Sequence, residues 1–423
     1  MPTYTTTSTA LALAKNFYLP AIRQYWKDLG GKKALFDREA PPRVRELSAR
    51  GGVIAISVNP NMQGGFFTEG GNLPIEGASD YVNATFTYTR YAQAVRLTGD
   101  ALQTLEREGP TAFANILSLE LRSAVEALNI LFNRYLNFDD TAALAVVDAA
   151  ATNSTTLQVG SGDRASFLAK GMIISLVDPA TGNYISGATG RTIVSIAPTN
   201  DAITLDAPVT CPRGALIVQR QSYGLGLYGL NYHLAANTWL GLDRSSTYAN
   251  MKGIIINAGG NVISADLLQQ AASMIETFGG DCYDYVPIWS PAQEAKYKAA
   301  GYGLKRFVDS EVVNLGFVET EFGRFRPFLT DRDTPASTIY FVNPKDFFWV
   351  NIQGIEWGTP DGQPMHIVVS GDTTGGVMQF RDQYWIPLIW RGQFINEFPF
   401  RLAAITNLAF DPIFRSRNYT SFN

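Results

Sequence analysis

The sequence predicts an α+β fold with an inserted all-β module, and three stretches of the chain lead to that prediction. Residues 110–138 repeat apolar side chains at spacings of three and four, which is typical of one long amphipathic helix. Residues 51–97 alternate with a period of two, which indicates a β ribbon. Residues 139–222 divide into short β runs separated by turn sequences, which predicts an all-β module, a small barrel or sandwich.

The predicted long helix is the structural axis of the chain. Pro110 suits the first helical position, where its missing N–H would have no partner. No further Gly or Pro interrupts the stretch, so the helix would span roughly 40 Å, far more than the average of about three turns. The apolar stripe consists of Phe113, Ile116, Leu117, Leu121, Ala124, Val125, Leu128, Leu131, Phe132 and Tyr135.

The composition leaves two descriptions of the surface open. Hydrophobic residues make up 46% of the 423 residues, which is enough for a large core. Charged residues make up 17%, against about 25% in typical soluble proteins. Aromatic side chains are plentiful, with 25 Phe, 19 Tyr and 7 Trp. Such a surface is expected where other subunits cover much of it, and the alternative is a large, well-buried monomer.

Charge and cysteine usage exclude several classes. The net charge of −4 argues against general nucleic-acid binding. Cys211 and Cys282 are far apart and lack a CxxC context, so we interpret both as reduced, small apolar residues. No apolar run approaches the length of about 18 residues expected of a membrane span. The N-terminus lacks the basic region of a signal peptide.

Residues 1–50 are predicted to form an extended arm. Between Lys15 and Arg50 there are nine Lys/Arg and four Asp/Glu, a local net charge of +5. This stretch is rich in turn residues and offers no pattern for a core, so an ordered arm would need a partner surface to lie on. The alternative is a solvated, disordered tail.

Residues 51–98 are predicted to form one long ribbon. Val53 to Val58 is β-branched, and a second alternating run extends through Leu97. The connection between them is dense in Gly, Pro and Asn and too long for a compact hairpin, which favours an extended loop with its own function. Phe66 and Phe67 at its tip require a neighbouring surface to bury them. Thr98 then caps a short helix that runs to about Glu108.

The second half of the chain predicts an α/β unit followed by returning strands. Ser264 caps an amphipathic helix that ends at Gly279-Gly280. The buried strand YDYVPIW follows, and Pro291 opens another helix to about Lys298. From Arg306 onward the chain reads mostly as β strands.

No catalytic or metal-binding constellation emerges from the sequence. His233 and His366 are the only histidines, and neither has the ligand spacing of a metal site, so we interpret both as structural. The motifs GxSxG, HExxH, Walker A and EF-hand are absent. The carboxylates in Glu319-Thr-Glu321 and Asp331-Arg-Asp333 are interpreted as ionic contacts or solvated turns. We therefore expect no enzymatic activity and no cofactor.

One glycine motif matches a dinucleotide fingerprint by its letters. Gly224, Gly226 and Gly229 form a GxGxxG after a possible strand. A dinucleotide site needs a helix that starts there, and an acidic residue at the end of a second strand. Neither is clear, and Asp243 is too near, so we favour a packing turn over a cofactor site.

The order of these elements resembles the major capsid proteins of tailed bacteriophages, which have the HK97-type fold. Residues 66–102 look like that family's extended loop returning into its backbone strand, and residues 110–138 look like its spine helix. Residues 264–301 look like the axial domain, and residues 385–406 look like the closing strand. The resemblance lies in order and pattern, and no single motif carries it.

The resemblance implies a division of the chain into six parts. These are an N-terminal arm (1–50), an extended β loop (51–98), a peripheral domain with the spine helix (99–138), the inserted β module (139–222), an axial domain with connecting strands (223–345) and returning strands of both domains (346–423).

The resemblance also implies the function and the contacts. The chain is expected to assemble in the host cytoplasm into hexamers and pentamers of an icosahedral virion shell around double-stranded DNA, which it would enclose without reading its sequence. A separate scaffolding protein, a portal and a decoration protein are the further partners implied, and no membrane is involved. Contacts between subunits are expected from the loop tip (Phe66, Phe67, Glu69, Leu73), from the arm (Arg23, Lys32, Lys33, Arg38, Arg43, Arg45) and from ion pairs of Glu106, Arg107 and Glu108. For Arg43 and Arg45 the alternative is contact with DNA.

The sequence departs from the family in one chemical respect. Some members join a loop lysine covalently to an asparagine of a neighbour, but no lysine lies between Val58 and Arg96 here. We therefore expect a non-covalent shell. The alternatives are an encapsulin-like nanocompartment shell and, more distantly, a Rossmann-type oxidoreductase based on the glycine motif.

Overall fold

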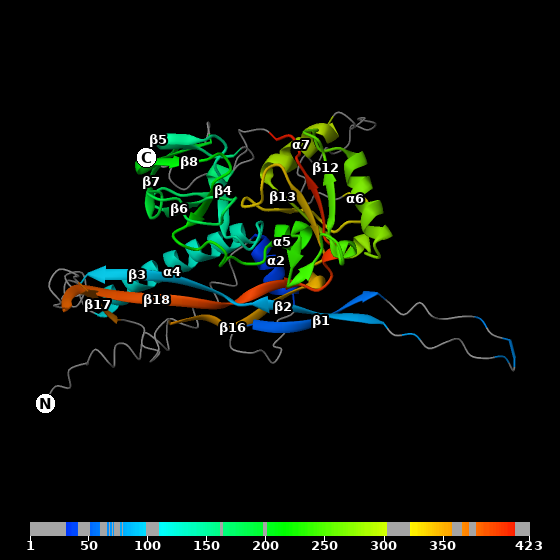
Figure 1. Cartoon of the computed structure of the whole chain (residues 1–423), viewed down its shortest axis with the longest axis horizontal. Helices are drawn as coiled ribbons and strands as arrows, with labels where there is room; N and C mark the ends of the chain where they lie inside the picture. Colours follow the sequence, from blue (N-terminus) through cyan, green and yellow to red (C-terminus); the bar gives the residue numbers. More distant parts are fainter. Residues whose placement is uncertain are drawn as a thin grey trace, which may run out of the picture.

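The computed structural model describes residues 31–40, 51–59, 79–98, 110–160, 164–197, 201–302, 322–357, 366–371 and 378–410, together with residues 66, 68, 69, 71 and 77. A long, flat base of strands carries the helix α4 (Pro110–Tyr135), and two further parts stand on this base (Figure 1). The predicted short helix before Pro110 lies outside the described residues. Among the described residues, no helix has both the length and the apolar character needed to cross a bilayer.

The base is a sheet built around one very long strand. Strand β18 (Met378–Asn396) pairs antiparallel with β16 (Phe347–Trp357) through its C-terminal half and with β17 (His366–Gly371) through its N-terminal half. Strand β3 (Thr89–Thr98) pairs with β18 from Gly392 to Gln383. Paired residues of β3 and β18 are thus 285 to 303 positions apart in the sequence.

The predicted ribbon is confirmed only in its first part. Strands β1 (Gly51–Asn59) and β2 (Asp80–Thr87) form an antiparallel pair in which Gly51 faces Thr87. After Tyr88 the returning run leaves this ribbon and joins the base as β3, so residues 51–97 do not form a single hairpin. The period of two predicts the strands correctly, but pairing with a strand near the C-terminus has no local signature.

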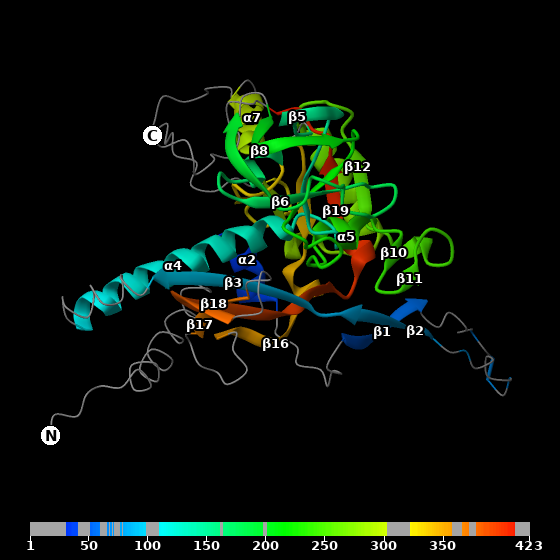
Figure 2. The same cartoon turned by 60° about the vertical axis from the view of Figure 1, so that its left-hand side comes forward.

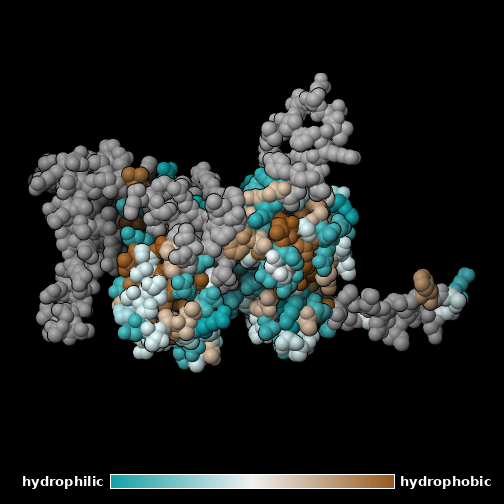
Figure 3. All heavy atoms as spheres, turned by 90° about the horizontal axis from the view of Figure 1, so that it is seen from above, coloured by the Kyte–Doolittle hydropathy of each residue, from teal (hydrophilic) through white to brown (hydrophobic). Residues whose placement is uncertain are grey.

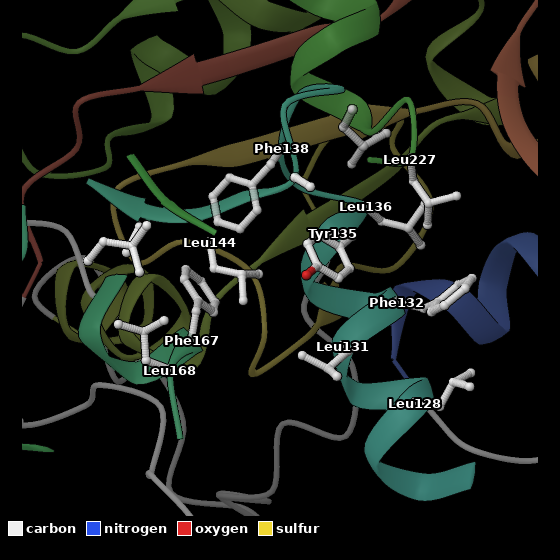
Figure 4. Close-up of a cluster of buried hydrophobic side chains, with 14 of the residues drawn as sticks. Leu128, Leu131, Phe132, Tyr135, Leu136, Phe138, Leu144, Phe167, Leu168 and Leu227 are labelled. Atoms are coloured by element: carbon white, nitrogen blue, oxygen red, sulfur yellow. The ribbon is translucent and has the colours of Figure 1, made fainter. Parts of the chain in front are cut away.

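The predicted long helix is confirmed, with its end at Tyr135 instead of Phe138. The next backbone bonds tighten to spacings of three, from Asn137 to Arg134 and from Phe138 to Tyr135. The C-terminal half of α4 is buried: Phe132 meets Trp390 of the base edge-on with ring centroids 4.8 Å apart. Figure 4 shows this half of the helix contributing to the same apolar cluster as Phe138, Leu144 and Phe167, so α4 joins the base to the next sheet.

Residues 143–219 form a six-stranded sheet with antiparallel neighbours throughout. Its order is β4-β9-β6-β7-β8-β5, and a bridge between Val147 and Val159 links the strands at its two edges. The two edges of the sheet therefore meet at this bridge. A short 3₁₀ helix, η1, covers Arg164–Phe167. The strands are β4 (Ala143–Val146), β5 (Ala151–Gln158), β6 (Ile173–Val177), β7 (Arg191–Ala197), β8 (Ala202–Cys211) and β9 (Leu216–Gln219).

The second upper part is an α/β unit with a five-stranded mixed sheet in the order β12-β19-β15-β13-β14. Ser264 caps α6 (Ala265–Thr277) as predicted, since its hydroxyl accepts from the Leu267 amide. Pro291 begins α7, which continues to Tyr302. The strands are β12 (Ile254–Asn257), β13 (Val286–Trp289), β14 (Leu329–Thr330), β15 (Ile339–Val342) and β19 (Ala403–Thr406); the 3₁₀ turns are η3 (Cys282–Asp284), η4 (Pro344–Asp346) and η5 (Pro399–Arg401).

The prediction of an extended arm is wrong for residues 31–40. Lys32–Glu39 form helix α2, which contacts α4 and β16 (Figure 2). Phe36 is fully buried, with its ring centroid 5.0 Å from that of Phe347 and 4.8 Å from that of Phe394. The prediction failed because two adjacent apolar residues in a basic stretch give no periodic pattern. The rest of the arm lies outside the described residues.

Candidate functional site

The ribbon has one face against the body and one face open to solvent. Ile54, Ile56, Ala84 and Phe86 are buried on the inner face, in a cluster that includes Trp239 and Ile395. On the outer face, Val53 is 54% exposed and Tyr81 is 67% exposed. Because side chains alternate across a strand, this register fixes which residues the ribbon offers to a partner.

A group of buried polar residues, Arg244, His233 and Trp239, lies beside the ribbon, and we call it the clamp. These residues belong to one segment that contains the short helix α5 (Leu230–Ala235), the two-residue strands β10 (Thr238–Trp239) and β11 (Leu242–Asp243), and η2 (Ala249–Met251). The Arg244 guanidinium donates to the carbonyls of Tyr232, His233, Ala236 and Met251 at 2.8–3.1 Å, so it joins the C-terminal end of α5 to η2. The Leu240 carbonyl in turn accepts from the Thr85 amide of the ribbon at 2.8 Å.

His233 is a structural residue of this clamp, as the sequence indicated. Trp239 Nε1 can only donate, so His233 Nδ1 accepts from it at 2.9 Å, and His233 Nε2 donates to the Phe394 carbonyl at 3.2 Å. Complete burial lowers the pKa of His233 to about 3, which keeps the ring neutral. The side chain of His366 lies outside the described residues. In the described part of the chain, no group of three or more His, Cys, Asp or Glu residues could hold a metal ion.

The described residues of the tip loop, which we define as residues 60–79, lie beyond the free end of the ribbon (Figure 1). Phe66 is 108% exposed, so none of the described residues covers it, and Glu69 is exposed as well. In Figure 3 the coloured atoms at the far end of the ribbon lie clear of the other described residues. Phe67 and Leu73 lie outside the described residues.

The predicted contacts of the arm divide into three groups. Arg38 is exposed on α2. Lys32 and Lys33 are 0% and 1% exposed within a single chain, so their prediction as contacts between subunits is wrong. Their amines bind acids of the same chain, because α2 packs into the body. Arg23, Arg43, Arg45, Glu106, Arg107 and Glu108 lie outside the described residues.

Lys32 belongs to what we call the buried junction: Lys32, Asn133, Arg134, Asp331 and Asp333. Lys32 Nζ lies 2.7 Å from Asp331 Oδ2, and Arg134 Nε lies 3.2 Å from Asp333 Oδ1. The Asn133 amide donates to both carboxylates at 2.9 Å. Two cations thus face two anions, and the junction ties α2 and α4 to the segment before β15.

Asp331 and Asp333 form ionic contacts, which is one of the two roles expected from the sequence, but their partners could not be predicted. Lys32 and Asp331 are 299 positions apart, so no spacing rule connects them. The glycine before α2 is the one local signal. Gly31 has φ +98°, and a Cβ there would lie 2.9 Å from Asn133 Nδ2, so only glycine fits without displacing the junction.

Two buried carboxylates make the stability of the folded subunit depend on pH in opposite directions. Burial opposes ionisation of Asp331, but the charge of Lys32 and hydrogen bonds from Lys32, Asn133 and Thr334 outweigh it and hold the pKa of Asp331 below its usual value. Its contribution to stability is therefore present above pH of about 3.9 and is lost as the pH falls through the folded pKa. Burial raises the pKa of Asp346 to about 6. Its contribution is present at low pH and is lost as the pH rises to about 6.

We therefore predict that the isolated subunit loses stability as the pH falls below about 4, and that it also loses stability as the pH rises from about 4 to about 6. Urea unfolding at a series of pH values measures the free energy of unfolding across both ranges. Asp331→Asn should weaken the dependence of this free energy on pH below about 4, which we call the acid limb, and Asp346→Asn should weaken the dependence between about 4 and 6. A wild-type acid limb that persists unchanged in Asp331→Asn would contradict the assignment.

The glycine motif packs against the end of the spine helix. The amides of Gly224, Gly226 and Leu230 donate to the carbonyls of Thr141, Asp140 and Leu136. A Cβ at Gly229 would lie 2.3 Å from the Phe138 oxygen. The helix that follows, α5, has six residues. The motif therefore brings two backbones into close contact, in agreement with the interpretation as a packing turn.

Comparison with known proteins gives a structural match only. No family model and no curated protein sequence matches the chain. Among solved structures, a chain of the cyanophage A-1(L) capsid asymmetric unit matches with a TM-score of 0.50 and 13% identity, over 90% of this chain and 94% of that one. A chain of Gordonia phage Cozz matches with a TM-score of 0.46 and 9% identity, over 89% and 87%. A chain of the satellite phage P4 procapsid, which includes the Sid protein, matches with a TM-score of 0.41 and 11% identity, over 96% and 93%.

The cyanophage match extends along nearly the whole of both chains, so it concerns the complete architecture and not one shared motif. It confirms the resemblance inferred from the order of elements in the sequence. The chain has the fold of a phage capsid protein, the HK97-type fold.

Proposed function

We propose that this chain is the major capsid protein of a tailed double-stranded DNA bacteriophage. Copies of it assemble in the host cytoplasm into hexamers and pentamers that close the icosahedral head around the genome. The observation that carries this proposal is the match to the cyanophage A-1(L) capsid over 90% of this chain and 94% of that one.

The projecting ribbon supports the same proposal. It ends in a phenylalanine that is 108% exposed, beyond the body of its own subunit. Burying such a side chain against a neighbour contributes about 1.5–3 kcal/mol. Closed symmetry repeats each contact many times, so contacts that are weak singly can hold a shell together.

The remaining contacts follow from the same proposal. Arg38 is exposed on α2 and is available to a neighbouring subunit. Arg23, Arg43 and Arg45 of the arm, Phe67 and Leu73 of the tip loop, and Glu106, Arg107 and Glu108 before the spine helix are proposed to contact neighbouring subunits. A scaffolding protein, a portal and a decoration protein are the proposed partners. The net charge of −4 suits a container that encloses DNA without binding it tightly.

The six-stranded sheet is proposed to be an addition to the shared capsid architecture. It closes on itself through the bridge between Val147 and Val159, and α4 connects it to the base. A self-contained sheet of this kind can be added between two elements without changing their packing.

We predict a shell without covalent links between subunits. The segment from Val58 to Arg96 contains no lysine, so a lysine–asparagine bond cannot form from the ribbon. Purified particles boiled in denaturant and run on a gel should give one band at the mass of the single chain, 46.3 kDa. A ladder of multimers that survives reducing agent would contradict this prediction.

Assembly of the purified chain, followed by light scattering, tests the proposed function itself. Growth to particles of many subunits supports a shell protein, and a stable monomer or dimer at high concentration contradicts it. DNA recovered from native particles distinguishes a phage head from an encapsulin-like nanocompartment.

A further inference from the structure

A groove of about 1140 Å³ separates the base from the six-stranded sheet. One wall consists of residues 89–94 of β3, and the other consists of residues 171–173, 175, 219–222 and 225–227. Its floor includes Phe132 and Tyr135 of the spine helix. The hydroxyls of Tyr91 and Tyr135 both donate to Gln219 Oε1, at 3.2 and 3.3 Å, so the walls are fixed to each other at the floor.

The groove carries positive charge. Arg90 and Arg220 are the charged side chains among its lining residues, which include no Asp or Glu. Within the described part of the chain, neither guanidinium has a carboxylate within 4.0 Å. Arg220 also has φ +49°, a conformation that costs a non-glycine residue on the order of 1 kcal/mol and that often marks a functional position.

The groove also exposes apolar side chains on the wall formed by the six-stranded sheet. Leu225 is 63% exposed and Ile173 is 37% exposed, and both belong to this lining. Met172 also lines the groove and packs against the apolar core. Such a surface fits a ligand that combines an acidic group with a large apolar side chain.

The tip loop has this combination. From Asn59 to Thr89 the chain contains Glu69, Glu76 and Asp80 and no Lys or Arg, a net charge of −3. Phe66 and Glu69 are both exposed, three positions apart. In Figures 1 and 2 the free end of the ribbon points away from the six-stranded sheet, so a loop that occupied the groove would have to come from another copy.

We infer that the groove between β3 and the six-stranded sheet receives the tip loop of a second copy of this chain, with Glu69 against Arg90 and Arg220 and with Phe66 against Ile173 and Leu225. The inference rests on the proposed shell function and adds the receiving surface. It gives the six-stranded sheet a role as one wall of a contact between subunits.

Charge reversal tests this pairing. Arg220→Glu should raise the protein concentration needed for assembly about 10-fold or more, because like charges across an interface cost more than 1.4 kcal/mol. Glu69→Arg alone should do the same, and the double variant should recover most of the loss. Arg213→Glu is the control, since Arg213 lies in the turn between β8 and β9 of the same sheet, outside the groove lining, with its side chain 76% exposed. Circular dichroism of each variant checks that the subunit is folded.

A cysteine pair gives a second measurement that does not depend on charge. Thr68→Cys combined with Gln221→Cys should form a disulfide between chains in assembled, oxidised particles and give multimers on a non-reducing gel. Assembly of Arg220→Glu at the wild-type concentration, or absence of the disulfide in intact particles, would overturn the groove assignment while the shell function stands. Wild-type protein that never assembles would instead overturn the proposed function.

Discussion

Asp331→Asn is expected to destabilise the subunit by about 3–5 kcal/mol, because it leaves the ammonium of Lys32 buried without an opposite charge. Lys32 and Asp331 are 0% and 3% exposed, and their charged atoms lie 2.7 Å apart. The same carboxylate accepts hydrogen bonds from Asn133 and Thr334. Denaturant unfolding of the unassembled subunit measures the change in the free energy of unfolding.

The double variant separates the buried charge from the loss of packing. Lys32→Met removes the ammonium and keeps an apolar stem of similar length, so Lys32→Met combined with Asp331→Asn should be more stable than Asp331→Asn alone. The control is Asp148→Asn, which breaks the exposed pair of Asp148 and Arg213 and should cost at most about 1 kcal/mol. Equal losses in Asp331→Asn and Asp148→Asn would show that the junction does not hold the domains together.

Gly229→Ala is expected to cost about 3 kcal/mol or more, at the upper end of overpacking effects. The added Cβ would lie 2.3 Å from the Phe138 oxygen, 2.6 Å from the Tyr135 oxygen and 2.9 Å from the Leu136 oxygen. All three are backbone atoms at the end of the spine helix, so no side-chain rotation can relieve the contact. The hydrogen bond from the Leu230 amide to the Leu136 carbonyl, now 2.7 Å, would also be strained.

Gly224→Ala is the matched control within the same motif. Gly224 has φ +72° and nothing within 4 Å of an added Cβ, so the change should cost only about 1 kcal/mol through the backbone conformation. Yield of folded subunit and the midpoint of thermal unfolding measure both variants. Similar midpoints for the two variants would contradict the role of Gly229 as a close contact between backbones.

The sequence predicted the elements whose signal is local. The spine helix followed from an apolar stripe over 110–138, and α6 followed from the cap at Ser264 and the stop at Gly279-Gly280. The turn-rich strands of the six-stranded sheet were also found, because each short run and each turn is visible within about ten residues.

The errors concern contacts between distant parts of the chain. A strand that ends at Leu97 was predicted, but its partner β18 begins about 280 residues later. Lys32 and Lys33 were assigned to an exposed arm because basic residues are usually solvated, whereas Asp331 neutralises Lys32 from 299 positions away. The groove was not predicted, since its walls come from β3 and from the loops of a separate sheet.

The most direct test of the central claim is negative-stain electron microscopy of the purified chain, with extraction of DNA from native particles. The account predicts closed shells of uniform size, or rings of five and six subunits, and native particles that contain double-stranded DNA. Single subunits or dimers at every concentration would contradict the shell function, and closed native shells that hold protein cargo but no DNA would contradict the phage head.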